Sequence, residues 1–187
     1  DGINDVGLYG RRLSSSRIQL FTKSGADRVG SLGIYSWPSD MADHKPLIVN
    51  DINFDGVKDF AVGGLREGAN RYQFIIKDGT DRGTTLANLG WPVTVEAPNF
   101  YEVNDVDGDG VLDFALAGNR MSDGKFEVSV KNLDNLKVDD FVSDTDWSEA
   151  PIVMPSPDIN GDGLADIVVY GYDKLGESVL EVLSASQ

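Results

Sequence analysis

Three short acidic segments carry the residue types that bind hard metal ions. They read DINFDGVKD from Asp51, DVDGDGVLD from Asp105 and DINGDGLAD from Asp158. Each has aspartate or asparagine at its first, third and fifth positions, glycine at the sixth and aspartate at the ninth. Carboxylates this close repel one another, so a folded chain must compensate them with solvent or with a cation. Cation binding is therefore the first hypothesis.

The spacing of these oxygen-bearing side chains is that of a calcium loop. The first, third and fifth side chains lie on one side of a tight turn, and the glycine permits the sharp reversal of the backbone. The seventh residue can offer its backbone carbonyl, and the ninth-position aspartate can add a carboxylate that binds through both oxygens. Oxygen ligands in a flexible number favour Ca²⁺ over Zn²⁺, whereas Mg²⁺ demands tighter octahedral geometry.

The segments differ from EF-hand loops at one decisive position. An EF-hand loop requires glutamate at its twelfth position, where this chain has Val62, Leu116 and Val169 inside apolar stretches. A solvated Asp-Gly turn is the alternative interpretation of any single copy. Three copies in register, each followed by an apolar stretch, favour metal sites.

The acidic segments belong to an internal repeat. Their starts lie 54 and then 53 residues apart, and the opening residues DGIND match the last five residues of the motif in the same register. Trp37-Pro38 and Trp91-Pro92 are also 54 residues apart, and Trp147 follows with a drift of two residues. RIQLFTKSG aligns with RYQFIIKDG and then with KFEVSVKN. The chain therefore contains four copies of one unit, of which the first and last are incomplete.

Each repeat is expected to contain four short strands. Apolar stretches that end in glycine, such as FAVGG and FALAG, follow the acidic segments and are too short for helices. An alternating segment such as RYQFIIK comes next, and a third segment leads to the tryptophan. A fourth strand is expected before each acidic motif, at 45–50, 99–104 and 150–155. Alternation predicts strands with one buried face.

We therefore predict an all-β fold of β-propeller blades, each a sheet of four antiparallel strands, with a repeat period of about 54 residues. The acidic motif is the loop between the first and second strands of a blade. The strands number three, four, four and three, which gives a partial propeller or arc of about 3.5 blades. The expected single repeat domain 1–187 has incomplete blades at 1–44 and 150–187 and complete blades at 45–98 and 99–149. We expect a fragment of a larger propeller, or an arc that another chain completes.

In these motifs the chain resembles the FG-GAP/VCBS repeat family, the calcium-loop blades of integrin α-subunit heads and of many bacterial surface proteins. The resemblance rests on DINFDGVKDFAVGG, DVDGDGVLDFALAG and DINGDGLADIVVYG, with Ala97-Pro98 and Ala150-Pro151 upstream of the second and third. It covers essentially the whole chain and implies a β-propeller with Ca²⁺ in about three of these loops. The implied ligands are the side chains of Asp51, Asn53, Asp55 and Asp59 with the carbonyl of Val57; Asp105, Asp107, Asp109 and Asp113 with the carbonyl of Val111; and Asp158, Asn160, Asp162 and Asp166 with the carbonyl of Leu164.

The first copy of the motif is only half present. Asp1, Ile3 and Asp5 match its second half, so at most a partial fourth site is expected there. Among the three complete loops, 105–113 has four carboxylates where the others have three. It is expected to bind Ca²⁺ most tightly, unless repulsion distorts the cation-free loop enough to offset that gain.

Composition restricts the partners of the chain. Its 31 acidic and 16 basic residues give a formal net charge of −15, which disfavours nucleic acid and anionic membranes. There is no cysteine, which excludes disulfides and thiolate metal sites. The sequence shows neither a bilayer-spanning apolar stretch nor a signal peptide. Extracellular or cell-surface placement is expected from calcium, since only the outside supply can fill weak loops.

The remaining chemical signals are weak. His44 is the only histidine, so a histidine-rich metal site is excluded. Ser14, Ser15 and Ser16 lack a glycine-flanked nucleophile elbow. The recurring tryptophans favour packing between blades over ligand stacking. No catalytic residues are predicted, and the chain is not expected to be an enzyme.

Three functions compete. The first is a calcium-binding extracellular module acting in protein interaction, adhesion or assembly. The second is a carbohydrate-binding lectin, for which Tyr35, Tyr101 and Tyr172 are candidate contacts. The third is an accessory part of a polysaccharide-degrading enzyme. We favour the first, because the motifs concern only the scaffold and the metal, and a propeller scaffold supports many functions.

Overall fold

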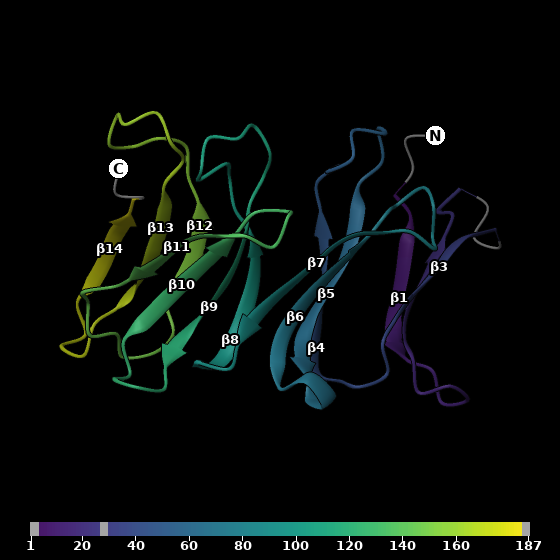
Figure 1. Cartoon of the computed structure of the whole chain (residues 1–187), viewed down its shortest axis with the longest axis horizontal. Helices are drawn as coiled ribbons and strands as arrows, with labels where there is room; N and C mark the ends of the chain where they lie inside the picture. Colours follow the sequence, from purple (N-terminus) through teal and green to yellow (C-terminus); the bar gives the residue numbers. More distant parts are fainter. Residues whose placement is uncertain (1–3, 27–29, 185–187) are drawn as a thin grey trace. The chain divides into compact units, whose positions relative to one another are not determined.

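The computed structural model describes residues 4–26 and 30–184, which form β-strands, turns and one short 3₁₀ helix, η1 (Glu67–Ala69) (Figure 1). The strands make four antiparallel sheets in which neighbours in sequence are neighbours in the sheet. The sheets comprise β1 (Val6–Arg11), β2 (Ile18–Lys23) and β3 (Ser31–Trp37); β4 (Met41–Val49), β5 (Asp59–Arg66), β6 (Arg71–Lys77) and β7 (Thr85–Pro92); β8 (Val95–Glu102), β9 (Phe114–Arg120), β10 (Phe126–Lys131) and β11 (Lys137–Val142); and β12 (Ile152–Pro155), β13 (Ile167–Tyr172) and β14 (Ser178–Leu183). The prediction of an all-β chain with antiparallel sheets of three or four strands is confirmed.

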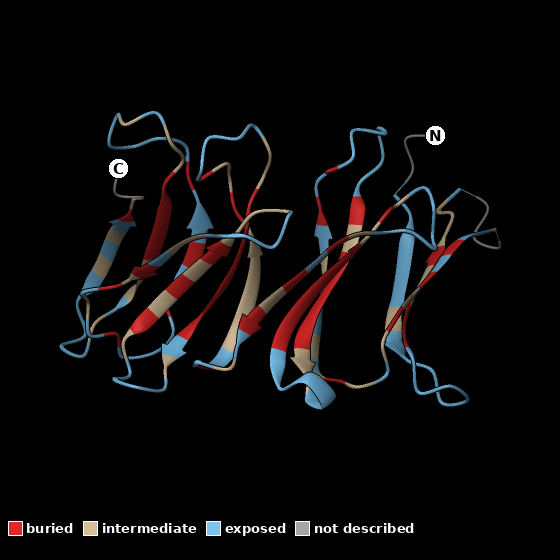
Figure 2. Cartoon of the chain, in the orientation of Figure 1, coloured by how far each residue is buried: buried red, intermediate tan, exposed pale blue. Residues whose placement is uncertain are grey.

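Alternating sequence becomes alternating burial in these strands. In β10, Phe126, Val128 and Val130 are buried while the residues between them are half-buried. Because successive side chains point to opposite faces of a strand, the apolar face packs inward and the polar face turns outward. Figure 2 shows the same concentration of buried residues on the strands, with exposed residues at most of the connections.

The strands expected at 45–50 and 99–104 begin earlier, because each contains a bulge. Pairing of β4 with β5 shifts register between Ala42 and Lys45, and pairing of β8 with β9 shifts between Glu96 and Asn99. Within the bulges Asp43 and Ala97 have positive φ angles of 49° and 44°. The added residues let each strand continue past a segment that looks like a loop in sequence.

The glycines that end the apolar stretches have a structural reason at these bulges. A Cβ at Gly64 would lie 2.8 Å from the carbonyl oxygen of Ala42, and one at Gly118 would lie 2.7 Å from that of Glu96. A side chain at either position would collide with the bulged backbone. In these two sheets the recurring glycine therefore permits the close approach of the first strand.

The chain divides into two compact units, residues 1–88 and 89–187. In the first unit the sheet of β1–β3 packs against the face of β4–β6. Their shared core contains Ile18, Tyr35, Trp37, Met41, Val62 and Ile75, with Tyr9, Leu20 and Phe60 beside it.

In the second unit the sheet of β8–β11 packs against the sheet of β12–β14. The apolar residues of β10 meet those of β13 and β14 in this core, which contains Val103, Val106, Ala115, Ala117, Phe126, Val128, Val130, Phe141, Trp147, Val153, Ile167, Val169 and Leu183.

None of the helices in the described part of the chain has the length and apolar character needed to cross a bilayer.

The three tryptophans are buried, as the packing interpretation predicted. Trp37 donates its indole N–H to the carbonyl of Ile75 at 3.0 Å, and Trp91 donates to the carbonyl of Ser129 at 3.1 Å. These two bonds are one repeat apart and have nearly the same length. Trp147, whose position drifts by two residues, donates instead to Ser143 Oγ at 2.7 Å.

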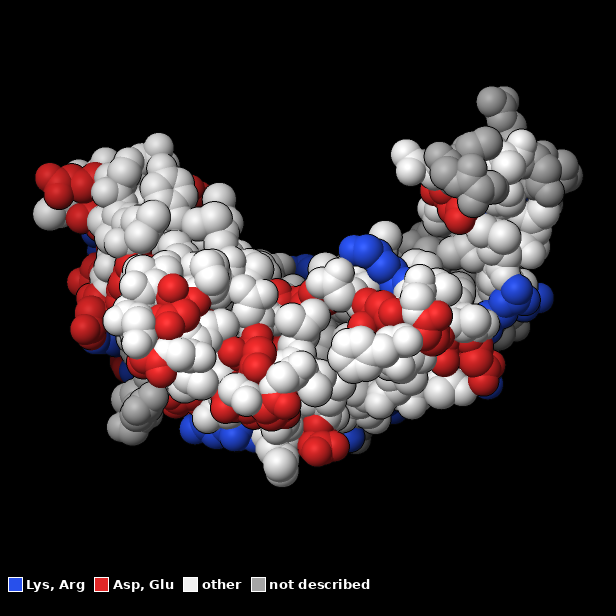
Figure 3. Space-filling model, turned by 90° about the horizontal axis from the view of Figure 1, so that it is seen from above, with Lys and Arg blue, Asp and Glu red and all other residues white. Residues whose placement is uncertain are grey.

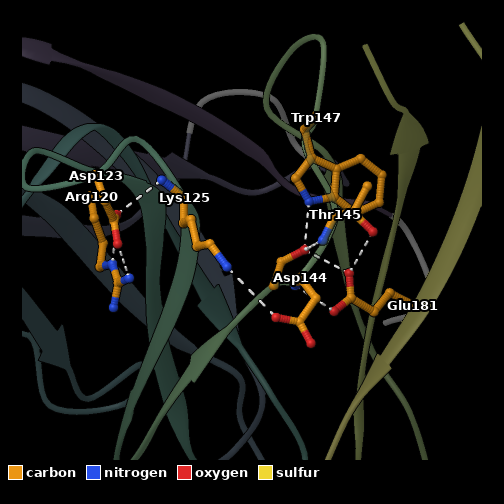
Figure 4. A network of polar contacts seen from close by, with 8 residues as sticks. Arg120, Asp123, Lys125, Asp144, Thr145, Trp147 and Glu181 are labelled. Atoms are coloured by element: carbon orange, nitrogen blue, oxygen red, sulfur yellow. Dashed lines mark hydrogen bonds and ion pairs between the residues drawn. The ribbon is translucent and has the colours of Figure 1, made fainter. Parts of the chain in front are cut away.

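Around Trp147 a polar cluster joins the two sheets of the second unit (Figure 4). Glu181 of β14 accepts hydrogen bonds from Ser143 Oγ at 2.6 Å, from the backbone N–H of Asp144 at 3.0 Å and from Thr145 Oγ1 at 2.9 Å. Burial by itself raises the pKa of Glu181, but these hydrogen bonds outweigh it and hold the pKa below its ordinary value. A charged glutamate thus takes part in packing between the sheets.

Candidate metal centres

The three acidic segments connect the first two strands of three sheets. They lie between β4 and β5, between β8 and β9, and between β12 and β13. We call them loop 51–59, loop 105–113 and loop 158–166. The structure places the residues at the first, third, fifth and seventh positions of each motif in one turn and the ninth at or next to the start of the following strand. Asp1 and Ile3 of the partial first copy lie outside the described residues, and Asp5 is exposed.

The first aspartate of each loop accepts hydrogen bonds from the backbone ahead of it. In loop 105–113, Asp105 Oδ1 accepts the N–H of Asp109 at 3.0 Å and Asp105 Oδ2 accepts that of Gly110 at 2.8 Å. The sixth-position glycine makes the corresponding bond in the other loops, Gly56 to Asp51 at 2.6 Å and Gly163 to Asp158 at 2.9 Å. This glycine has a φ of 90°, 89° and 91° in the three loops, which other residues rarely adopt.

The third and fifth side chains repeat this arrangement. The third residue accepts the N–H of the fifth, as from Asp109 to Asp107 at 3.1 Å, and the fifth accepts the N–H of the seventh, as from Val111 to Asp109 at 2.8 Å. Both bonds recur in the other two loops. Each hydrogen bond fixes a side chain on the inner side of the turn, so three side chains per loop converge.

The ninth-position aspartates are buried beneath their loops. Asp59, Asp113 and Asp166 are 0 %, 0 % and 1 % exposed. Each accepts the N–H of the second residue of its own loop, from Ile52 at 3.0 Å, Val106 at 2.8 Å and Ile159 at 2.7 Å. This bond joins the ninth residue of the loop to the second. It adds a fourth, buried side chain to the three that converge in the turn.

The second oxygen of this carboxylate distinguishes the loops. Asp59 Oδ1 accepts the N–H of Gly79 at 2.8 Å, and the carboxyl group of Asp166 accepts a hydrogen bond from the side chain of Ser184. Asp113 Oδ1 is buried and has no hydrogen-bond partner. A buried carboxylate oxygen without a donor is costly, so a cation is the natural partner for it.

Three carboxylates of loop 105–113 lie close enough to share one ion. Oxygen atoms of Asp105, Asp107 and Asp109 all lie within 4.8 Å of one another. Burial and, to a smaller extent, the charges of these three aspartates raise the pKa of Asp113 to about 7, against a hydrogen bond from Val106 that lowers it. The four carboxylates therefore repel one another, and a bound cation would reduce this repulsion.

The electrostatics of the other two ninth-position aspartates follow their partners. Burial raises the pKa of Asp59 above its ordinary value, against hydrogen bonds from Gly79 and Ile52 that lower it. Burial also acts to raise the pKa of Asp166, but its hydrogen bonds from Ser184, Ile159 and Asn160 outweigh burial and lower the pKa. In these two loops, hydrogen-bond donors of the chain thus partly stabilise the charged carboxylate, as a cation would.

Sequence reasoning missed a residue that follows the third strand of each complete sheet. Asn53 donates its side-chain N–H to Asp78 Oδ2 at 3.2 Å, and Asn132 donates to Asp107 Oδ2 at 3.3 Å. Asp78 and Asn132 are one repeat apart, in the turns after β6 and β10. The aligned segments RYQFIIKDG and KFEVSVKN contain both residues, so a shared polar position after a strand was the available signal.

These donor sets fit a hard divalent cation. Their candidate ligands are carboxylate and amide oxygens, with a backbone carbonyl proposed at Val57, Val111 and Leu164, and oxygen-only sets of this kind suit Ca²⁺. Acidic side chains recur across the face of the molecule shown in Figure 3, in keeping with the net charge of −15.

The other candidate residues have ordinary structural surroundings. His44 Nδ1 lies 2.7 Å from the hydroxyl of Tyr9, and burial lowers the pKa of His44 while raising that of Tyr9 to about 12. Tyr35 is buried and donates its hydroxyl to the carbonyl of Gly79 at 2.6 Å. Tyr172 is 48 % exposed and is the most exposed of the three candidate sugar contacts.

Comparison with known proteins adds no family to this description. No family model matches the chain, and no curated protein matches it. The resemblance to FG-GAP/VCBS repeats therefore stays an expectation from the residues of the three motifs.

Proposed function

We propose that the chain is a calcium-binding β-propeller module of the FG-GAP/VCBS type, extracellular and without catalytic activity, that acts in protein interaction, adhesion or assembly. One observation carries this proposal. Three loops at a spacing of 53 and 54 residues have the same hydrogen-bonded frame, and one of them holds a buried carboxylate oxygen without a donor beside three more carboxylates.

The role of calcium follows from the charge of the loops. A bound Ca²⁺ supplies two positive charges to each cluster and links side chains that otherwise repel one another. Three ions would change the formal charge from −15 to about −9. The loop backbone is already arranged by its own hydrogen bonds, so the ion would stiffen a formed turn and hold the adjoining strands in register. Stiff loops on a rigid sheet are suited to presenting a binding surface.

The propeller assignment is supported by sheets that pack face to face within each unit. The first sheet has a further face that remains open, on which Leu8, Phe21 and Ile34 form one cross-strand row. Leu8 is 64 % and Ile34 is 46 % exposed. One repeat later, the residue equivalent to Phe21 is Ile75, which is buried in the core between two sheets.

The fourth sheet also has an open apolar face. Cross-strand rows run from Ile152 through Tyr170 to Leu180 and from Met154 through Val168 to Val182. In the third sheet Val130 pairs with Ala115 as Val182 pairs with Val168, and Val130 is fully buried in the core between the third and fourth sheets. We therefore take both open faces to be positions where further propeller sheets pack, from another part of the propeller or from another protein chain.

Calorimetric titration with Ca²⁺ tests the metal assignment. We expect about three ions to bind to the wild-type chain, and one fewer after D107N/D109N. The control D144N/D146N removes the same charge from exposed side chains outside the loops and should leave the number of ions unchanged. Equal loss in both variants would mean that Ca²⁺ responds only to overall charge.

Glycan-array binding, measured with Ca²⁺ and with a chelator, separates the module from a lectin. The buried tryptophans do not offer stacking surfaces. We therefore expect no calcium-dependent sugar binding by the folded protein. Binding to one defined sugar would instead favour the lectin, and Y172A would then test the most exposed of the candidate rings.

A further inference from the structure

We propose that the cation sites of loop 105–113 and loop 158–166 are coupled, so that filling one increases the affinity of the other. This inference rests on the proposed calcium binding. It concerns a relation between sites that the loop motif does not contain, because the motif describes each loop separately.

A single peptide unit touches both sites. The N–H of Ala165 donates to the backbone carbonyl of Asp105 at 3.2 Å. The same peptide unit contains the carbonyl of Leu164, which is the seventh-position oxygen proposed to bind the cation of loop 158–166. When a cation draws electron density toward that oxygen, the N–H at the other end of the peptide becomes a stronger donor. The bond to Asp105, the first residue of the other site, is thereby strengthened.

Side-chain packing supports the same connection. A Cβ built at Gly108 would lie 3.0 Å from Cδ2 of Leu164, so this leucine rests against the fourth residue of loop 105–113. If Leu164 moves when its carbonyl binds an ion, the packing at Gly108 would therefore change. Because Gly108 has no side chain, Leu164 has room to pack against this loop.

A second hydrogen bond joins the segments that lead into the two loops. Asn104 donates its side-chain N–H to the carbonyl of Ser156 at 2.8 Å, and the N–H of Ser156 donates to the carbonyl of Asp166 at 3.0 Å. The residue before the first aspartate of one loop is thus connected to the ninth aspartate of the other. In Figure 1 both loops lie at the same end of the second unit.

The coupling should be positive. Loop 105–113 contains the four mutually repelling carboxylates and the unpartnered oxygen of Asp113, so it has the most to gain from being held in the binding geometry. An ion that orders loop 158–166 also holds Asp105 in place, by way of the hydrogen bond from Ala165. The ion that binds loop 105–113 then pays a smaller entropy cost for ordering that loop. Because linkage is reciprocal, each ion changes the affinity of the other by the same factor.

Site-resolved titration tests the coupling. The backbone amides of the sixth-position glycines, Gly56, Gly110 and Gly163, can each be followed by NMR in ¹⁵N-labelled full-length protein while Ca²⁺ is added. The variant D158N/D162N removes the site of loop 158–166. We expect the Ca²⁺ concentration at half-response of Gly110 to rise about 3- to 10-fold, an effect about the size of one net hydrogen bond. Gly56 belongs to the first unit and should not change.

The reciprocal and matched variants complete the test. D107N/D109N should raise the half-response of Gly163 by the same factor. N104A breaks the bond to Ser156 outside the ligand set and should reduce the effect of D158N/D162N on Gly110. N50A, which alters the same position of loop 51–59, should leave that effect intact.

The possible failures are distinguishable. If Gly163 stops responding in D158N/D162N and Gly110 keeps its wild-type midpoint, the coupling is wrong and calcium binding stands. If none of the three glycines responds to Ca²⁺ in the wild-type chain, calcium binding fails and the coupling fails with it.

Discussion

Asp59 and Asp113 occupy the same position in two loops of the same pattern, yet their carboxylates have different hydrogen-bond partners. Both are fully buried, and each accepts an N–H from the second residue of its loop. The other oxygen of Asp59 accepts the N–H of Gly79, whereas that of Asp113 has no partner. Loop 51–59 is therefore closed by its own chain, while loop 105–113 leaves a buried carboxylate oxygen that a cation or a proton could satisfy.

The difference originates in one glycine. A Cβ at Gly79 would lie 2.1 Å from the carbonyl oxygen of Lys58, so the turn after β6 reaches Asp59 only because this residue has no side chain. One repeat later the equivalent residue is Leu133. A leucine cannot approach the loop so closely, and Asp113 lacks the corresponding N–H. Two loops of the same pattern are thus expected to depend on a bound cation to different degrees.

Removal of the cation should have the largest effect and should separate the two loops most clearly. A site filled at about 100 times its dissociation constant contributes about 2.7 kcal/mol to stability. In chelator we expect amide hydrogen exchange to accelerate strongly in loop 105–113 and less in loop 51–59, because Gly79 still holds Asp59. Equal acceleration in both loops would show that the bond from Gly79 does not replace the ion.

Neutralising the two aspartates in chelator should have effects of different size and sign. D59N places an amide donor against one of two backbone N–H groups, so we expect a loss of about 2 kcal/mol in the free energy of unfolding. D113N removes a buried charge and can keep the bond from Val106, so we expect no loss, or a gain, at pH 8. Urea unfolding of both variants measures the difference, and a larger loss for D113N would contradict it.

The stability of the cation-free protein should fall as pH rises through neutrality. Burial raises the pKa of Asp113 to about 7, whereas its ordinary value is 3.8. Because the folded state holds this proton more tightly, the contribution is fully present below pH 3.8 and is lost as pH rises through about 7. Urea midpoints of wild type and D113N, compared between pH 5 and pH 8 in chelator, isolate this group. The wild type should lose more stability than D113N.

Exchange of the residues after β6 and β10 should have the smallest effect. Asp78 contacts loop 51–59 where Asn132 contacts loop 105–113. A carboxylate adds negative charge beside the ligands, so D78N should lower the Ca²⁺ affinity of loop 51–59 about 2- to 5-fold, and N132D should raise that of loop 105–113. Site-resolved titration measures both, and changes in the same direction would rule out this electrostatic explanation.

Asp78 changes the ranking of the loops by carboxylate count. The sequence gives loop 51–59 three carboxylates and loop 105–113 four. The structure adds Asp78 beside Asn53, which brings a fourth carboxylate to the first of these loops. Tightest binding by loop 105–113 stays a prediction. It now depends on the unpartnered oxygen of Asp113 more than on the number of charges.

The local features of this protein were readable from the sequence because they depend on neighbouring residues. Side chains at alternate positions and a glycine with positive φ at the sixth position specify the turn of each loop. Alternating apolar residues predicted the strands, as in β10, where Phe126, Val128 and Val130 form one face. The repeat period placed the loops between the first two strands of their sheets.

The tertiary structure decided what residues distant in sequence do for one another. The bulges at Asp43 and Ala97, the approach of Gly79 to Asp59 and the bond from Ala165 to Asp105 all join segments that no local pattern connects. Trp147 shows the same limit, since a drift of two residues gives its indole a side-chain partner where Trp37 and Trp91 have backbone carbonyls. Spacing along the chain specifies which oxygens face a turn. Whether those oxygens are already satisfied depends on which backbone groups the packed sheets bring within hydrogen-bonding distance.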